Sequence, residues 1–149
     1  MAYEQLRLAN QGCFRLYTAA RLITNSYQPC LSKMGITYTQ YLVLMVLWEH
    51  DHQPVNDIAR RLLLDTNTVT PLIKRMEALK IVSRRKDKDD ARRIIVSLTE
   101  RGRAMEKEAA EIPDCMEDIF CGKEVDVEAL SSIFPVLDDF IAKMSKIEE

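Results

Sequence analysis

Hydrophobic residues recur every three or four positions over most of the chain, and this spacing predicts a mainly helical protein. The clearest stripe follows Asp65, the expected N-cap of a helix that runs to Leu79. Pro71 lies in the first part of this helix, where little is lost because the early N–H groups have no partner within the helix. The residues predicted to face a core are Val69, Leu72, Ile73, Met76 and Leu79.

A shorter helix is predicted just before it, from Val55 to Leu62. Two short helices joined by a tight turn are typical of a helix-turn-helix. The β-branched runs 81–85 and 94–98 follow, and between them lies the sequence KDKDDARR, which is too charged to be buried. We interpret this pair of runs as a hairpin with a protruding wing.

The terminal parts of the chain are also helical in pattern. The spacing predicts one long helix over residues 4–33, disturbed by Pro29 and ended by Gly35. The sequence TYTQ at 37–40 is a capping box, and the apolar residues after it predict a buried helix ending near Trp48.

Two more helices are predicted after the hairpin. Thr99 caps a helix that ends near Phe120 and is kinked at Pro113. Asp126 caps a last helix, which Pro135 is expected to bend.

The terminal helices carry wider apolar stripes than a small winged unit needs to cover its own core, which favours a homodimer. We expect one chain-wide unit, 1–149, that is mainly α with a small β-hairpin wing. Residues 1–36 and 100–149 would form dimerisation helices, and residues 37–99 a winged helix-turn-helix. The alternative is a monomeric bundle, but a symmetric dimer would place two recognition helices about one DNA turn apart.

Charge is distributed unevenly. The net charge is -2, yet residues 60–93 hold 11 Lys and Arg against five acids, whereas residues 104–149 hold four Lys against 13 acids. The first segment therefore suits the phosphates of double-stranded DNA, and a palindromic operator is the expected partner.

The DNA contacts can be assigned by residue type. Asp87 and Asp90 repel phosphate, so we expect them to hold the wing and to aim Arg92. Arg75 suits a base or a phosphate, whereas Arg84, Lys86 and Arg92 suit phosphates or the minor groove. The candidates for base edges are Thr66, Asn67, Thr68, Thr70 and Lys74.

Composition excludes other classes. No apolar run approaches a membrane span and the first residues lack a leader pattern, so we expect a cytoplasmic protein with no membrane partner. His50 and His52 flank Asp51 without a third ligand, so neither a metal nor a cofactor is expected. The cysteines show no C-x-x-C pair and are interpreted as thiols: Cys13, Cys30, Cys115 and Cys121.

The order of elements, with DTNTVTPLIKRMEAL followed by VSRRKDKDDARRIIVSLTERG, resembles the MarR family over essentially the whole chain. Asp87, Asp90 and Arg92 match its D-x-x-D-x-R wing motif. The segment NQGCFRLYTAARLITNSYQPCLSKMGITYTQYLVLMVLWE is similar to the OhrR subgroup of organic hydroperoxide sensors.

This resemblance implies that Cys13 is the redox-sensing cysteine and that Tyr17, Tyr27 and Tyr38 hydrogen-bond its sulfur. It also implies a resolving cysteine on the partner subunit, for which both Cys115 and Cys121 are open and Cys115 is favoured. Judged by itself, a thiol on an apolar stripe such as that of Cys13 is commonly an inert core residue.

The expected function is a repressor that leaves DNA when an oxidant converts Cys13 to a sulfenic acid. A repressor of the same fold released by an aromatic or phenolic ligand, with Cys13 incidental, is the alternative. A thiol peroxidase is a third class, but no Cys/His arrangement supports it, so we expect no enzyme and no catalytic residues.

Overall fold

The computed structural model describes residues 3–145, so residues 1–2 and 146–149 of the predicted dimerisation segments lie outside it. In chain order the elements are η1 Glu4–Leu6, η2 Leu8–Asn10, α1 Gly12–Ser26, α2 Gln28–Leu31, η3 Ser32–Met34, α3 Tyr38–Glu49, β1 Gln53–Pro54, α4 Val55–Leu62, α5 Thr66–Ala78, β2 Val82–Lys86, β3 Ile94–Leu98, α6 Glu100–Ala109, α7 Ile112–Gly122, α8 Val127–Ser131 and α9 Phe134–Met144.

The predicted helix-turn-helix is confirmed as α4 and α5. Their apolar stripes turn inward, and Ile58 and Ile73 are completely buried. Leu79, which was predicted for the same stripe, is 40% exposed because it lies just beyond the end of α5. Asp65 occupies the N-cap position of α5, but its side chain makes no capping bond. Pro71 is accommodated within the helix, as expected.

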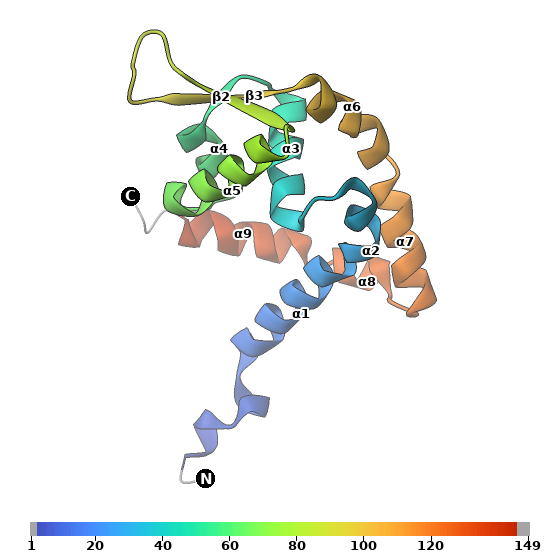
Figure 1. Cartoon of the computed structure of the whole chain (residues 1–149). Helices are drawn as coiled ribbons and strands as arrows, with labels where there is room; N and C mark the ends of the chain where they lie inside the picture. Colours follow the sequence, from blue (N-terminus) through green and yellow to red (C-terminus); the bar gives the residue numbers. More distant parts are fainter. Residues whose placement is uncertain (1–2, 146–149) are drawn as a thin grey trace.

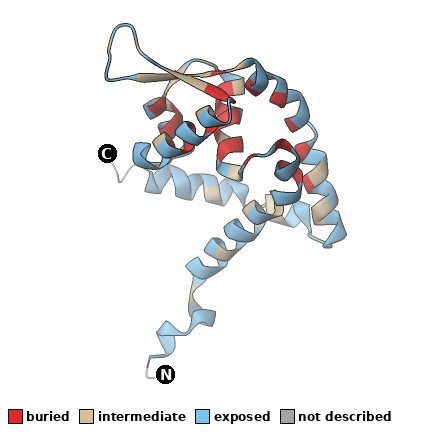
Figure 2. Ribbon diagram, viewed as in Figure 1, coloured by how far each residue is buried: buried red, intermediate tan, exposed pale blue. Residues whose placement is uncertain are grey.

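Helix α3 is the centre of the core. The predicted capping box is present, because the Gln40 N–H donates to Thr37 Oγ1 and the Thr37 N–H donates to Gln40 Oε1 at 3.0 Å. Val43, Leu44 and Leu47 on this helix have no exposed surface. Figure 2 shows the buried residues gathered around α3, α4, α5 and the adjoining ends of β2 and β3, with further buried positions on α2, α6 and α7.

The wing is a three-stranded antiparallel sheet of order β1-β3-β2 rather than a simple hairpin. Val82 pairs with Leu98 at its base and Lys86 pairs with Ile94 at its outer end. The additional strand, β1, has only two residues and pairs with Ile95 and Val96. The loop that joins β2 to β3 projects away from the helices (Figure 1).

A tight corner joins the winged helix-turn-helix, residues 37–99 and called the winged body below, to α6. Thr99 Oγ1 accepts from the Gly102 N–H at 3.1 Å, and Trp48 Nε1 donates to the Gly102 carbonyl at 2.9 Å. A Cβ at Gly102 would lie 2.2 Å from the Ile81 carbonyl oxygen, so only glycine fits there. Backbone contact thus fixes the direction in which α6 leaves the body.

The prediction of one long N-terminal helix over residues 4–33 is wrong. Arg7 and Gln11 adopt extended backbone conformations, so two short 3-10 turns precede α1. Helix α1 ends at Ser26, and α2 begins one residue before Pro29, which occupies its first turn. Gly35 then ends the segment with a left-handed φ of 69°, as expected.

Each of the two C-terminal helices is also broken into two. Pro113 lies in the first turn of α7 and Pro135 in the first turn of α9, where a missing N–H costs nothing. The chain therefore turns before each proline instead of bending at it. The Asp126 cap is confirmed, since its Oδ1 accepts from the Ala129 N–H at 2.9 Å.

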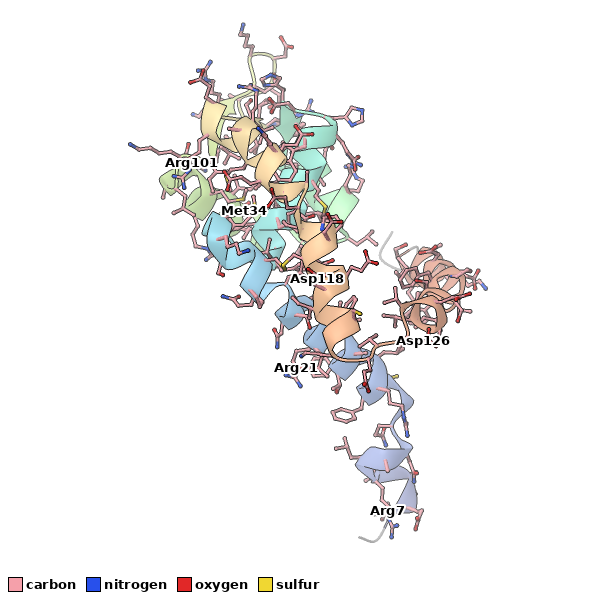
Figure 3. The ribbon with its side chains drawn as sticks, turned by 90° about the vertical axis from the view of Figure 1, so that its right-hand side faces the viewer. Arg7, Arg21, Met34, Arg101, Asp118 and Asp126 are labelled. Carbon is pink, nitrogen blue, oxygen red and sulfur yellow. A yellow bond between two sulfur atoms is a disulfide. The ribbon has the colours of Figure 1, made fainter. Side chains whose placement is uncertain are left out.

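Helices α1, α8 and α9 bury no residue, although each is rich in large apolar side chains. We call these helices the arms. Figure 1 shows α1 extending away from the winged body, and Figure 3 shows α9 standing apart from α6 and α7. This exposed apolar surface disagrees with a monomeric bundle. The exposed apolar side chains of the arms include Phe14, Leu16, Leu22, Phe134, Val136, Phe140 and Ile141.

Within residues 3–145, no single helix is long and apolar enough to cross a bilayer. The segments 12–34 and 38–49 meet the criterion only when taken together across a bend of 71°, and α3 in the second of them is the core helix described above.

Candidate DNA interface and redox site

The face of α5 opposite the core is polar and open to solvent. Thr70 is partly exposed. The other predicted base-edge and phosphate residues of this helix are exposed: Thr66, Asn67, Thr68, Lys74 and Arg75. Thr66 Oγ1 donates to Asn56 Oδ1 at 3.2 Å, which connects the start of α5 to α4. Hydroxyl, amide and ammonium groups therefore line one accessible helix face.

A groove of about 150 Å³ lies between these two helices and the wing. It brings together Thr66, Thr70, Arg84 and Arg92 from the sequence prediction. It also contains Asn56 and Arg93, which the sequence analysis left unassigned. Asn56 could have been identified from its position as the second residue of α4, because the N–H groups at the start of a helix favour anions such as phosphate.

Arg84 is engaged differently from the expectation. Its Nε and Nη2 each lie 2.8 Å from Glu77 Oε2, and its backbone N–H donates to Glu77 Oε1 at 3.2 Å. The guanidinium fork is therefore occupied by a carboxylate at the end of α5. This pair ties the wing to the recognition helix.

At the wing tip, Arg92 is almost fully exposed and is held by Asp90. The Asp90 Oδ1 accepts from the Arg92 N–H at 3.0 Å and from its Nε at 3.2 Å. These bonds from Arg92 hold the pKa of Asp90 below its ordinary value. Asp87 instead accepts from the Asp89 N–H and lies 3.7 Å from Arg93. The two aspartates thus shape the wing, and Asp90 is the one that orients Arg92.

Asp51 has a structural role that the sequence analysis missed. Burial raises its pKa, but N–H donors from Leu98 and His52, together with Arg103, outweigh this and hold the pKa below the ordinary value. The Leu98 bond measures 2.8 Å and the Arg103 bond 3.1 Å. Asp51 therefore links the end of α3 to β3 and α6.

Cys13 is exposed, not part of a core stripe. It is the second residue of α1, in the turn whose N–H groups have no partner within the helix and which favours negative charge. Tyr17 lies one turn further along the same face and is 66% exposed. Within one chain, Cys13 and Tyr17 are therefore neighbours on an open surface.

Tyr27 and Tyr38 form a separate aromatic cluster. Their ring centroids are 4.8 Å apart, and Tyr41, which the sequence analysis did not single out, lies 6.2 Å from Tyr27. Burial, followed by the neighbouring Tyr27, raises the pKa of Tyr38, and burial likewise raises that of Tyr41. The phenols of Tyr38 and Tyr41 consequently remain hydrogen-bond donors over a wide pH range.

One chain does not bring the cysteine and this cluster together. Cys13 begins α1 and Tyr27 follows its end, so 14 residues of helix separate them by roughly 21 Å. The predicted set of Cys13, Tyr17, Tyr27 and Tyr38 is therefore divided between two places on one protomer.

The sequence interpretation of four free thiols is wrong for two of them. Cys30 in α2 and Cys115 in α7 form a disulfide, with 6.2 Å between their Cα atoms and 85 residues between them in sequence. Figure 3 shows α7, labelled at Asp118, passing the segment that ends at Met34, where this bond is made. Cys13 and Cys121 are free and exposed. In this state Cys115, the favoured resolving cysteine, is already occupied.

Comparison with known proteins identifies the family. Residues 25–109 match the model described as transcriptional regulator SarA/Rot. The organic hydroperoxide resistance transcriptional regulator of Bacillus subtilis (strain 168) is 41% identical over 111 residues, covering 74% of this chain and 76% of that protein. The chain belongs to the MarR family of transcriptional regulators. Within it, this MarR protein groups with the OhrR-like members.

Solved structures of AbfR from Staphylococcus epidermidis resemble this MarR chain over nearly its whole length. Reduced AbfR bound to DNA superposes with a TM-score of 0.78 at 37% identity, covering 97% of this chain and 99% of that one. Disulfide-formed AbfR gives 0.65 at 38% identity, covering 93% and 95%. The winged fold, together with helices α1, α8 and α9, is thus that of a DNA-binding MarR regulator.

Proposed function

We propose that the protein is a dimeric transcriptional repressor that binds a palindromic operator and leaves it when a cysteine is oxidised. The observation that carries this proposal is the fit of 97% of the chain to reduced AbfR bound to DNA. The cytoplasm is the expected location, because that is where a bacterial operator is found. Since its relatives are transcriptional regulators, the thiol peroxidase is set aside.

For DNA binding, α5 enters the major groove. Thr66, Asn67, Thr68, Thr70 and Lys74 contact base edges there, and Arg75 contacts a base or a phosphate. The wing contributes Arg92 and Lys86 to phosphates or the minor groove. Arg84 lies in the same groove but has its fork on Glu77, so its contribution is to position the wing.

The dimer is formed by the arms, within the segments 1–36 and 100–149. Their exposed Leu, Ile and Phe side chains have the character of half a core, which a second copy completes. Residues 37–99 then remain free to meet DNA, two copies to one operator.

The redox site is completed by the same dimer. If the α1 helices pair antiparallel, Cys13 of one protomer approaches Tyr27 and Tyr38 of the partner subunit, because a helix of this length separates them by roughly 21 Å within one chain. A tyrosine hydroxyl donates a hydrogen bond to a thiolate and so favours the charged form of the cysteine, and the raised pKa of Tyr38 keeps its hydroxyl a donor. Tyr17 on the cysteine's own helix adds a third donor.

The chemistry is a two-electron oxidation. The Cys13 thiolate attacks the outer oxygen of an organic hydroperoxide, the O–O bond breaks, and the products are a sulfenic acid and an alcohol. Cys115 or Cys121 of the partner subunit then displaces water to form a disulfide. A bond between α1 of one protomer and α7 of its partner changes the separation of the recognition helices, and a palindromic operator tolerates little of this.

The test uses the Cys13→Ser variant and a fluorescent operator duplex. Cumene hydroperoxide should release the wild type and leave Cys13→Ser bound, with equal affinities before oxidant. The Gly12→Ala variant is a matched control that keeps the thiol in the same exposed turn and adds a Cβ with nothing within 4 Å. It should be released like the wild type and still label at Cys13 with a sulfenic acid reagent. Release of Cys13→Ser at the wild-type dose would remove Cys13 from the sensor.

A specific observation also supports the ligand-released alternative. A hollow of about 460 Å³ lies beside Tyr38, between α1, α2, α3 and the end of α4. An aromatic carboxylate fits such a volume. Salicylate should then release wild type and Cys13→Ser alike, without oxidant, which separates this function from the redox one.

A further inference from the structure

The Cys30–Cys115 bond joins α2, which precedes the winged body, to α7, which precedes the arm helices α8 and α9. Cys30 in α2 is 5% exposed, while Cys115 in α7 remains partly open to solvent. Cys115 is therefore within bonding distance of Cys30 and is also accessible from solvent. A sulfur holds only one disulfide, so any bond from Cys115 to Cys13 must exclude the bond to Cys30.

The chain has the shape of a DNA-binding regulator while this bond is in place. It superposes on reduced AbfR bound to DNA with a TM-score of 0.78 and on disulfide-formed AbfR with 0.65. The Cys30–Cys115 bond is thus compatible with the DNA-bound conformation. A disulfide at this position is a different state from one that links two protomers.

We propose that Cys30 is an exchange thiol that resets the sensor by taking Cys115 away from oxidised Cys13. This inference rests on the proposed function, in which Cys13 is oxidised and Cys115 of the partner subunit resolves it. Cys30 then serves as a third thiol of the reaction, and the bond seen in the structure is its product.

The exchange balances without a further oxidant. The Cys30 thiolate attacks Cys115 Sγ, the S–S bond to Cys13 breaks, and Cys13 leaves as a thiolate that takes up the proton lost by Cys30. Two electrons have passed to the hydroperoxide, and they come in sum from Cys30 and Cys115. Cys13 is restored, and the link between protomers is gone.

The oxidised pair is open to reduction. A hollow of about 170 Å³ adjoins it, lined by Lys33, Met34 and Glu108. Two molecules of a small thiol reduce the bond in succession and leave as their own disulfide. DNA release is therefore a pulse: the repressor rebinds after exchange, before any reductant has acted.

The experiment follows fully reduced protein on a fluorescent operator after one equivalent of cumene hydroperoxide per protomer. Non-reducing gels and peptide mapping are taken over time. The wild type should release DNA, form a Cys13–Cys115 linked dimer, and then rebind as the Cys30–Cys115 peptide appears with Cys13 free. In Cys30→Ser the linked dimer and the released state should last about tenfold longer or more, since the neighbouring thiol is absent.

Cys30→Ala is the second variant, because it keeps an apolar side chain at a buried site, and equal operator affinity before oxidation shows that both variants fold. The proposal is overturned by a linked dimer with the same lifetime in wild type and both variants. It is equally overturned by Cys30–Cys115 forming in Cys13→Ser as fast as in wild type, or by a linked peptide that contains Cys121 in place of Cys115. Release of Cys13→Ser by hydroperoxide would instead refute the proposed function itself.

Discussion

The winged body and the arms both contain many large apolar side chains, yet only the body buries them. In the body, Leu44, Ile58 and Ile73 lose all contact with solvent. In the arms, Leu16, Phe134 and Phe140 remain half exposed or more. The body is therefore a complete folding unit, whereas the arms, as proposed above, form a core only together with a second copy. Substitutions of the same kind should have different consequences in the two regions.

The largest effect should come from breaking the arms. Phe140→Asp places a charge at the centre of the exposed α9 stripe and should give a folded monomer. Affinity for a palindromic operator should then fall by about 100-fold or more, because two linked half-site contacts become one. Sedimentation and operator titration measure both effects. Lys143→Ala on the same helix should change neither, and a dimer that survives Phe140→Asp would refute this assignment of the arms.

A matched pair of leucines tests whether the body folds by its own core. Leu44→Ala should cost about 2–5 kcal/mol of unfolding free energy, since it leaves a cavity in the core. Leu16→Ala should change the free energy of amide hydrogen exchange in α3 and α5 by no more than about 0.5 kcal/mol relative to the wild type. Its effect should appear as weaker dimerisation. Equal loss of protection in both variants would mean that the body has no stability separate from the dimer.

A matched pair of glycines tests the corner between the body and α6. Gly102→Ala should cost about 1–3 kcal/mol because its Cβ meets the Ile81 carbonyl and neither backbone can retreat. Gly12→Ala has nothing within 4 Å of its Cβ and should be neutral or slightly stabilising. Thermal unfolding of the two variants provides the comparison, and a neutral Gly102→Ala would show that α6 can move freely.

The smallest effect concerns two aspartates. Asp51→Asn should cost about 1 kcal/mol at neutral pH, because a charged acceptor for Leu98 and Arg103 is lost. Asp126→Asn should lower the free energy of unfolding by only a few tenths of a kcal/mol, because asparagine caps a helix as well as aspartate does. The pKa of Asp51 is lowered in the folded state, so its stabilisation is present above the unfolded pKa and disappears as pH falls through the folded one. The difference between wild type and Asp51→Asn should therefore vanish in acid, and a constant difference would contradict this.

Much of the fold could be predicted because its signals are local. The capping box at 37–40, the stripe of α5 and the charged loop between two β-branched runs each lie within a few residues. The broken helices could not be predicted so easily. Apolar spacing continues through Arg7 and Gln11, and nothing in the pattern indicates that the stripe has no partner within the chain.

The candidate site divides in the same way. Exposed polar residues on α5 could be predicted from the helix face that lies opposite the apolar one. The partners of Arg84 and Asp51 could not, because Glu77 lies across a turn and Leu98 lies 47 residues away. The Cys30–Cys115 pair had no signal at all, since 85 residues of helices and sheet separate two ordinary cysteines.

Helix α1 places Cys13 at one end and Tyr27 just beyond the other, and this has a consequence for genetic complementation. If each sensor takes its cysteine from one protomer and its phenols from the next, a chain lacking Cys13 still carries an intact set of phenols. Paired with a chain that lacks Tyr27, it rebuilds one whole sensor and leaves the other doubly defective. Two lesions that are each disabling in a homodimer therefore complement one another when both chains are made in the same cell.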